Sequence, residues 1–202
     1  HECSSAASDV YKRQLLFEPS AEEIYNKDET ILKNNNYNNI LCDKYRKGHF
    51  DGVITVLNKF FSIVKSNKVY FGEKDFQQLK IIEKFIQEKY EFLEIVSVPT
   101  KRNEEGIAYS SRNEKLSKKQ IQDFVSFHQK VENFLKTLEK SFDINTANQK
   151  AKDFIVEQDI EEFDYFEFRN NEDLSFNGKV SESRLFYAIY KGKIRLIDNL
   201  KI

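Results

Sequence analysis

The sequence is poor in residues that build special sites or interrupt regular structure. Its 202 residues contain no Met and no Trp, only 2 Cys, 2 Pro and 6 Gly. Cys3 and Cys42 stand far apart and match neither a zinc-binding pattern nor a disulfide framework, so we assign no metal ligands. Two lone thiols fit a reducing cytoplasm. Because breakers are few, each Gly and Pro is a candidate turn or boundary.

Long apolar runs and an excess of either charge are also missing. No uninterrupted apolar stretch approaches the ~18 residues that span a bilayer, and no secretory hydrophobic segment stands at the start. The formal net charge is −1, whereas nucleic-acid-binding domains usually carry a basic face. We therefore expect a cytoplasmic protein whose partners are neither membranes nor nucleic acids. With 40% hydrophobic residues the chain can still bury a core.

Composition and periodicity divide the chain into three segments. Residues 1–14 are small and polar, lack any period and resemble translated adaptor sequence, so we expect a non-native or disordered leader. Residues 15–100 have strand and helix patterns that we expect to form the C-terminal part of a larger domain. Pro99 ends these patterns, and residues 101–202 form a smaller C-terminal domain.

Residues 15–100 predict a βαβ unit. An amphipathic helix opens at Asp51 or Gly52, with an apolar face of Val53, Val56, Leu57, Phe60, Phe61 and Val64. A second helix runs to about Lys89, with its apolar face formed by Phe76, Leu79, Ile82, Phe85 and Ile86. It lies between two runs of buried-strand composition, residues 69–71 and 93–98. Two strands joined by one helix should be parallel.

Residues 101–202 predict an α+β domain. Ser117 and Gln120 form a capping box before a long helix whose apolar face includes His128, which we interpret as a packed side chain. A weaker helix covers about residues 146–157. Apolar and polar residues then alternate in two runs, which predicts two strands of an antiparallel sheet. The apolar positions are Phe163, Tyr165 and Phe168 in the first run and Leu185, Tyr187 and Ile189 in the second. A turn at residues 191–193 leads into the last strand, where we expect Arg195 and Asp198 to pair.

The loop between the first strand and its helix is the best candidate for chemistry. Gly72 breaks the strand, Asp75 stands where a helix N-cap belongs, and Lys74 adds a mobile positive charge between them. A loop at a helix N-terminus favours an anion, and Gly lets backbone approach a ligand closely. The alternative is an ordinary turn with a solvated lysine. The Lys44, Arg46 and Lys47 cluster is interpreted as a solvated loop.

Several segments read together resemble one enzyme family. They are Gly-His-Phe-Asp-Gly-Val (48–53), Tyr-Phe-Gly-Glu-Lys-Asp-Phe-Gln-Gln (70–78), Val-Pro-Thr (98–100), Ser-Ser-Arg-Asn (110–113) and Ile-Arg-Leu-Ile-Asp-Asn (194–199), with Arg102 and Gly106 between. In this order and spacing they closely resemble pantoate–β-alanine ligases (pantothenate synthetases). The resemblance implies an α/β fold: a partial Rossmann-like nucleotidyltransferase domain with a parallel βαβ unit, then a small α+β domain with an antiparallel sheet covering the site.

The family resemblance also implies a reaction and site residues. It implies ATP and Mg²⁺, and condensation of pantoate with β-alanine through a pantoyl-adenylate, releasing AMP and pyrophosphate. The ATP-binding positions would be Gly72, Glu73, Lys74, Asp75, Lys101, Tyr109, Ser110, Ser111 and Arg112. Gln78 would bind pantoate. Lys101 departs from a position that is usually apolar, which is harmless if only its backbone is used. Without the other segments, Ser-Ser-Arg-Asn would be a common turn.

One family feature has no match in the chain. The HxGH-type motif that supplies the family's catalytic histidine is not found, so no catalytic residue is assigned; His49 is interpreted mainly as a structural position. We expect that the 202-residue chain alone does not make pantothenate, and that the full-length protein is a homodimer. The alternatives are a non-catalytic nucleotide-binding or dimerisation module of the same family, and another adenylating transferase of the superfamily.

Overall fold

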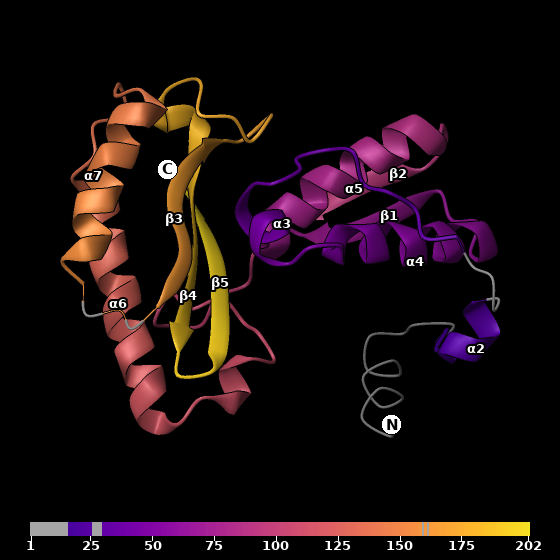
Figure 1. The fold of residues 1–202 in the computed structure, drawn as a ribbon, viewed down its shortest axis with the longest axis horizontal. Coiled ribbons are helices and arrows are strands. Elements are labelled where there is room, and N and C mark those ends of the chain that lie inside the picture. Colours follow the sequence, from indigo (N-terminus) through magenta and orange to yellow (C-terminus); the bar gives the residue numbers. More distant parts are fainter. Residues whose placement is uncertain (1–15, 26–29, 159, 161) are drawn as a thin grey trace.

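The computed structural model describes residues 16–25, 30–158, 160 and 162–202, so the expected leader lies outside the described residues. Figure 1 shows two bodies side by side. The first half of the chain supplies α2 (Ala21–Ile24), α3 (Leu41–Tyr45), α4 (His49–Ile63), β1 (Lys68–Gly72), the 3-10 turn η1 (Glu73–Asp75), α5 (Phe76–Lys89) and β2 (Glu94–Val98). The second supplies η2 (Asn113–Lys115), α6 (Lys118–Lys136), α7 (Ile144–Val156), β3 (Phe163–Asn170), η3 (Val180–Glu182), β4 (Ser183–Lys191) and β5 (Ile194–Lys201).

The predicted βαβ unit is confirmed. β1 and β2 pair in parallel, from Lys68 opposite Glu94 to Gly72 opposite Val98, and α5 connects them. All five apolar positions predicted for α5 are buried. The prediction that both strands are buried is wrong: Tyr70 is 65% exposed and Val98 42%. Among the described residues the helices cover one face of this sheet, so alternate side chains remain exposed.

The helices before β1 differ from their predicted limits and faces. α4 begins at His49, after Gly48 in a left-handed conformation (φ 75°), and buries Phe50, Ile54, Thr55 and Phe61. The predicted apolar face is therefore rotated, and Val64 is exposed, because the packing of α3 and α5 selects which stripe is covered. The predicted basic loop is wrong at Lys44, which belongs to α3 and places its Nζ 5.4 Å from the Tyr45 ring centroid.

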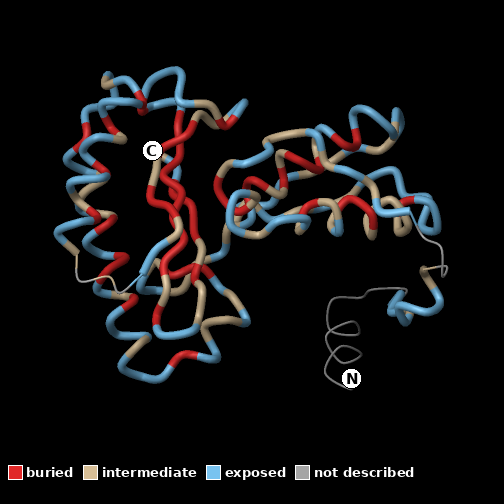
Figure 2. Tube along the Cα trace, viewed as in Figure 1, coloured by how far each residue is buried: buried red, intermediate tan, exposed pale blue. Residues whose placement is uncertain are grey.

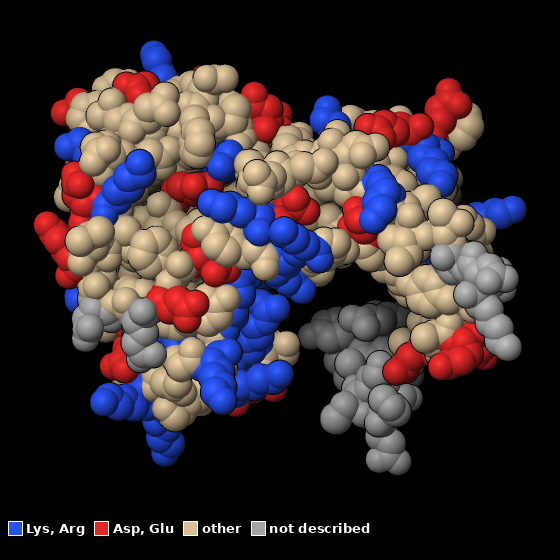
Figure 3. Space-filling model, in the orientation of Figure 1, with Lys and Arg blue, Asp and Glu red and all other residues tan. Residues whose placement is uncertain are grey.

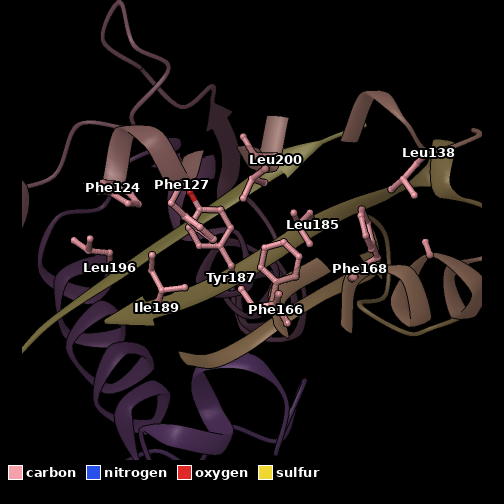
Figure 4. Packing of buried hydrophobic residues seen from close by; sticks show 14 of the residues in the cluster. Phe124, Phe127, Leu138, Phe166, Phe168, Leu185, Tyr187, Ile189, Leu196 and Leu200 are labelled. Atoms are coloured by element: carbon pink, nitrogen blue, oxygen red, sulfur yellow. The ribbon is translucent and has the colours of Figure 1, made fainter. Parts of the chain in front are cut away.

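The second half of the chain has the predicted antiparallel sheet, in the order β3-β4-β5. Ser117 and Gln120 form the predicted capping box of α6. On one face of the sheet, the rings of Phe127, Phe166 and Tyr187 point toward one another under α6 and α7 (Figure 4). The Phe127 and Tyr187 ring centroids are 5.6 Å apart. As predicted, His128 is a packed side chain of this core.

The second face of this sheet is buried too, so the expected simple alternation is incomplete. Phe186 and Ala188 of β4 pack against the first half of the chain, together with Tyr165 of β3. Tyr165 thus lies on the opposite face from Phe166 and Phe168, and the β3–β4 register shifts between Phe163 and Tyr165. Figure 2 shows the resulting band of buried residues along the sheet. The boundary near residue 100 stays a prediction, but one apolar core crosses it.

The predicted pairing of Arg195 with Asp198 is wrong. The Nε of Arg195 donates to Asp164 Oδ2 at 2.6 Å, and Asp198 pairs with Arg102 instead. Residues three apart in a strand point to opposite faces, so the two side chains of β5 cannot meet. Among the described residues, no helix is long and apolar enough to cross a membrane.

Candidate functional site

The loop after β1 borders a pocket where the two halves of the chain meet. The pocket has an empty volume of about 410 Å³, including open solvent. Lys74 and Gln78, which are four residues apart, both line it. Arg46 and His49 line it from the other side of the first half, and Ile197, Asp198 and Asn199 line it from β5. Cationic and amide groups thus share a pocket with apolar walls.

The loop itself is a turn of 3-10 helix rather than an open anion nest. Asp75 is the N-cap of α5, as predicted, but its side chain makes no capping hydrogen bond. The Lys74 Nζ lies 3.8 Å from an Asp75 carboxylate oxygen. Gly72 has ordinary extended backbone (φ −74°), and a Cβ added there would meet nothing within 4 Å. The backbone at Gly72 therefore does not require a glycine, and the missing side chain leaves open space beside the loop.

Two residues of the C-terminal sheet hold this loop. The Asn199 side-chain amide donates to the carbonyl oxygens of Glu73 at 2.8 Å and Lys74 at 2.9 Å. Arg184 donates to the Glu73 carboxylate at 2.8 Å and to Asn199 Oδ1 at 2.7 Å. The Glu73 side chain thus points to Arg184, although Glu73 was predicted to bind ATP. Sequence reasoning missed Arg184, whose one available signal is a charged residue within an apolar strand.

A second, smaller cavity adjoins the first. It is lined by residues of two cationic loops, the Lys74 loop (residues 72–75) and the Arg112 loop (residues 102–113). It has an empty volume of about 270 Å³, including open solvent, and its lining includes Lys74, Ser110, Arg112 and Asp198. Lys74 and Asp198 line both cavities. Within the second loop, Ser110 Oγ accepts from the Arg112 backbone N–H at 3.2 Å. The fold therefore brings Lys74 and Arg112, which are far apart in sequence, to one cavity.

Five residues predicted to bind ATP lie outside both cavity linings: Gly72, Glu73, Lys101, Tyr109 and Ser111. Lys101, Tyr109 and Ser111 are exposed. The Lys101 Nζ is 5.7 Å from the Tyr109 ring centroid, so these two side chains face each other at the surface. A role for them in binding requires the nucleotide to extend beyond the cavities.

The second loop is anchored to β5 through Arg102. Its guanidinium donates to the Asp198 carboxylate at 2.6 and 3.0 Å, and also to the Gly106 and Asn199 carbonyls, each at 3.0 Å. The Tyr187 hydroxyl donates to Asp198 at 3.4 Å. Burial raises the pKa of Tyr187 well above its ordinary value, and the negative charge of Asp198 adds to this, so the hydroxyl remains a donor.

The histidine beside the pocket, His49, is half-buried. Burial lowers its pKa, the positive charge of Arg46 lowers it further, and Asp75 acts in the opposite direction. His49 is therefore a neutral group on the pocket wall near neutral pH. No group of three or more His, Cys, Asp or Glu among the described residues could hold a metal ion. On the face shown in Figure 3, Lys and Arg side chains gather near the junction of the two bodies.

Comparisons with known proteins place this arrangement in one family. The model of the pantoate-beta-alanine ligase family matches residues 2–201. A pantothenate synthetase from Caldicellulosiruptor bescii is 35% identical over 190 residues, 93% of this chain and 67% of that protein. A pantothenate synthetase structure from Thermus thermophilus has a TM-score of 0.88 and 28% identity, covering 99% of this chain and 74% of its own.

A third match is to a family member whose structure superposes less well on this chain. A pantoate-beta-alanine ligase from Francisella tularensis, crystallised with beta-gamma ATP and beta-alanine, has a TM-score of 0.56 and 28% identity. It covers 96% of this chain and 61% of its own. Because the family model spans residues 2–201 and the Caldicellulosiruptor bescii protein is 35% identical over 93% of this chain, the chain belongs to the pantoate–β-alanine ligase family.

Proposed function

We propose that this protein takes part in the ATP-dependent condensation of pantoate with β-alanine, through a pantoyl-adenylate, to give pantothenate, AMP and pyrophosphate. One observation carries the proposal: Lys74 lines both of two adjoining cavities, one shared with Gln78 and the other with Arg112. A related ligase was crystallised with beta-gamma ATP and beta-alanine, which supports ATP as a substrate. Two cations on adjoining walls suit a polyphosphate lying between them.

In the first step a carboxylate oxygen of pantoate attacks the α-phosphorus of ATP. The bond from that phosphorus to the β-phosphate bridging oxygen breaks, and pyrophosphate leaves. Negative charge moves onto the departing phosphates, where Lys74 and Arg112 stabilise it from two sides. Gln78, on the wall of the larger pocket, offers an amide that can donate to and accept from pantoate hydroxyls.

In the second step the amine of β-alanine attacks the activated acyl carbon. The acyl–oxygen bond to AMP breaks, AMP leaves, and the new amide nitrogen loses its proton. Adenylation is needed because a free carboxylate is a poor electrophile. The neutral His49 lines the same pocket as Gln78.

Mg²⁺ enters this proposal with ATP, since it commonly bridges phosphates and keeps several waters. The described residues offer no group of three or more His, Cys, Asp or Glu for it, so ATP phosphates and water would supply most of its ligands. The homodimer and the cytoplasmic location belong to the same proposal. We also propose that the 202-residue chain alone binds ATP but does not complete the reaction, because it contains no HxGH-type motif.

Calorimetric titration of the chain with ATP tests the binding part. We expect Lys74→Ala and Arg112→Ala each to weaken ATP binding about tenfold or more, the loss of one charge-assisted contact. Lys84→Ala, at an exposed lysine of α5, is the matched control and should change the dissociation constant less than about twofold. A parent chain that does not bind ATP, or Lys74 and Arg112 variants that bind like the control, would contradict the proposal.

An activity assay tests the remaining part. The chain is incubated with ATP, pantoate, β-alanine and Mg²⁺, and pantothenate is measured. We expect none above background. Steady turnover would show that the chain supplies every catalytic group itself.

A further inference from the structure

Two neighbouring residues of β5 each hold one of the two cationic loops. Leu196 and Leu200 belong to the core under α6 and α7, and Ile197 packs against the core of the first half. Successive side chains of a strand point to opposite faces. Asp198 therefore faces the α6 side and reaches the loop of Arg112, while Asn199 faces the first half and reaches the loop of Lys74. β5 is the strand drawn nearest the first body in Figure 1.

Asn199 is chemically suited to its loop. Its amide nitrogen donates to two consecutive carbonyl oxygens, those of Glu73 and Lys74, and its oxygen accepts from Arg184. Arg184 in turn holds the Glu73 carboxylate, with its guanidinium 4.0 Å from the Phe76 ring centroid. An aspartate here would place a carboxylate against two carbonyl oxygens and lose both donors. The backbone that carries Lys74 thus depends on an amide at position 199.

Asp198 fixes the other loop at its base. Both carboxylate oxygens accept from the Arg102 guanidinium, and Oδ1 also accepts from the Asn199 backbone N–H at 2.8 Å. Arg102 spans the loop by donating to the Gly106 carbonyl as well. Asp198 is 4% exposed and Asn199 2%. Both line the larger pocket, yet their polar atoms already bond protein groups.

We propose that Asp198 and Asn199 are positioning residues that set the separation of Lys74 from Arg112, so that one polyphosphate contacts both cations. The inference rests on the proposed function. It assigns neither residue a contact with substrate. Because one short strand carries both anchors, the two loops keep a fixed spacing instead of moving independently.

Amide hydrogen exchange of the ligand-free chain tests the anchoring without any substrate. Asn199→Asp should increase exchange about tenfold in residues 73–78, and Asp198→Asn should do so in residues 102–113. The matched control is Asn148→Asp, because the Asn148 amide also makes two backbone bonds, to Phe168 O at 3.0 Å and from Phe168 N at 2.7 Å, remote from the cavities. Unchanged exchange in both loops, or equal loosening by the control, would overturn the inference.

Nucleotide titration separates positioning from general destabilisation. In the proposal the phosphate chain of ATP lies between the two cations, whereas AMP has a single phosphate and lacks that chain. We expect Asn199→Asp and Asp198→Asn to weaken ATP binding about tenfold and AMP binding less than about twofold, and Asn148→Asp to change neither. Equal losses of affinity for ATP and AMP would indicate a structural role only and would contradict the inference. If the parent does not bind ATP, the proposed function fails, and the exchange experiment alone decides the anchoring.

Discussion

His128 is the buried titratable side chain with the clearest consequence for stability. It is fully buried, with Nδ1 3.2 Å from the Tyr187 hydroxyl, and no hydrogen-bond partner is found for Nε2 among the described residues. The Glu132 carboxylate is 3.6 Å from Nε2. Burial lowers the pKa of His128; Asp198 and Glu132 oppose this, and Arg102 adds to it.

The sign of the pH effect follows from that lowered pKa. The unfolded chain takes up the His128 proton near its ordinary pKa of about 6.5, before the folded chain does. The free energy of unfolding should therefore fall as pH drops from about 7 to about 5. His128→Gln, which does not titrate, should show a smaller fall in urea unfolding at the same pH values. His49→Gln should also reduce the fall, because burial lowers the pKa of His49 as well. A His128→Gln slope equal to the parent's would refute the assignment to His128.

At the scale of elements, α6 depends on its N-terminal cap. Ser117 Oγ accepts from the Gln120 backbone N–H at 3.3 Å, and Gln120 Oε1 accepts from the Ser117 N–H at 2.9 Å. The Gln120 amide also donates to the Lys191 carbonyl at 3.2 Å, which links the helix to the β4–β5 hairpin. The cap therefore joins a helix start to a turn far along the chain.

Removing this cap should lower stability by a predictable amount. Ser117→Ala should lower the free energy of unfolding by about 1 kcal/mol, because an orphan helix N–H loses its acceptor. Gln120→Ala should cost more, since it also removes the bond to Lys191. Ser126→Ala, at an exposed position within α6, should stay within about 0.5 kcal/mol of the parent. Denaturant midpoints measure all three, and equal midpoints for Ser117→Ala and Ser126→Ala would contradict the prediction.

Helices and caps that depend on residues close in sequence could be predicted. Which faces of those elements other parts of the chain cover could not. The capping box and the apolar face of α5 involve residues within a few positions, so the sequence pattern contains them. The exposure of Tyr70 depends on what covers the sheet, which no local pattern records. The same applies to β4, where the burial of Phe186 comes from the first half of the chain.

At the scale of the whole molecule, the site combines local and distant information. Lys74 and Gln78 are only four residues apart, so local geometry brings them to one pocket, and family resemblance linked Lys74 with Arg112. The anchors Asp198 and Asn199 could not be assigned, because their partners in the two loops lie 96 or more residues away. Pairing over such separations is decided by how the two halves dock.

That docking predicts a single cooperative unfolding transition. Phe186 belongs to the core of the first half, and its ring centroid is 6.0 Å from that of Phe76. Because the chain has no Trp, a single introduced Trp reports one location. Phe71→Trp on β1 and Phe134→Trp on α6, where Phe134 stacks on Phe154, should give coincident urea midpoints.

The same reporters then test the cause of the cooperativity. Adding Phe186→Ala empties the shared core at the junction and should separate the two midpoints, because each half then unfolds with its own core. Phe92→Ala, at a side chain that is 85% exposed, should leave them coincident. Separate midpoints without Phe186→Ala would mean that the two halves unfold independently, and the contacts of Asn199 and Arg184 across the junction would then be too weak to couple them.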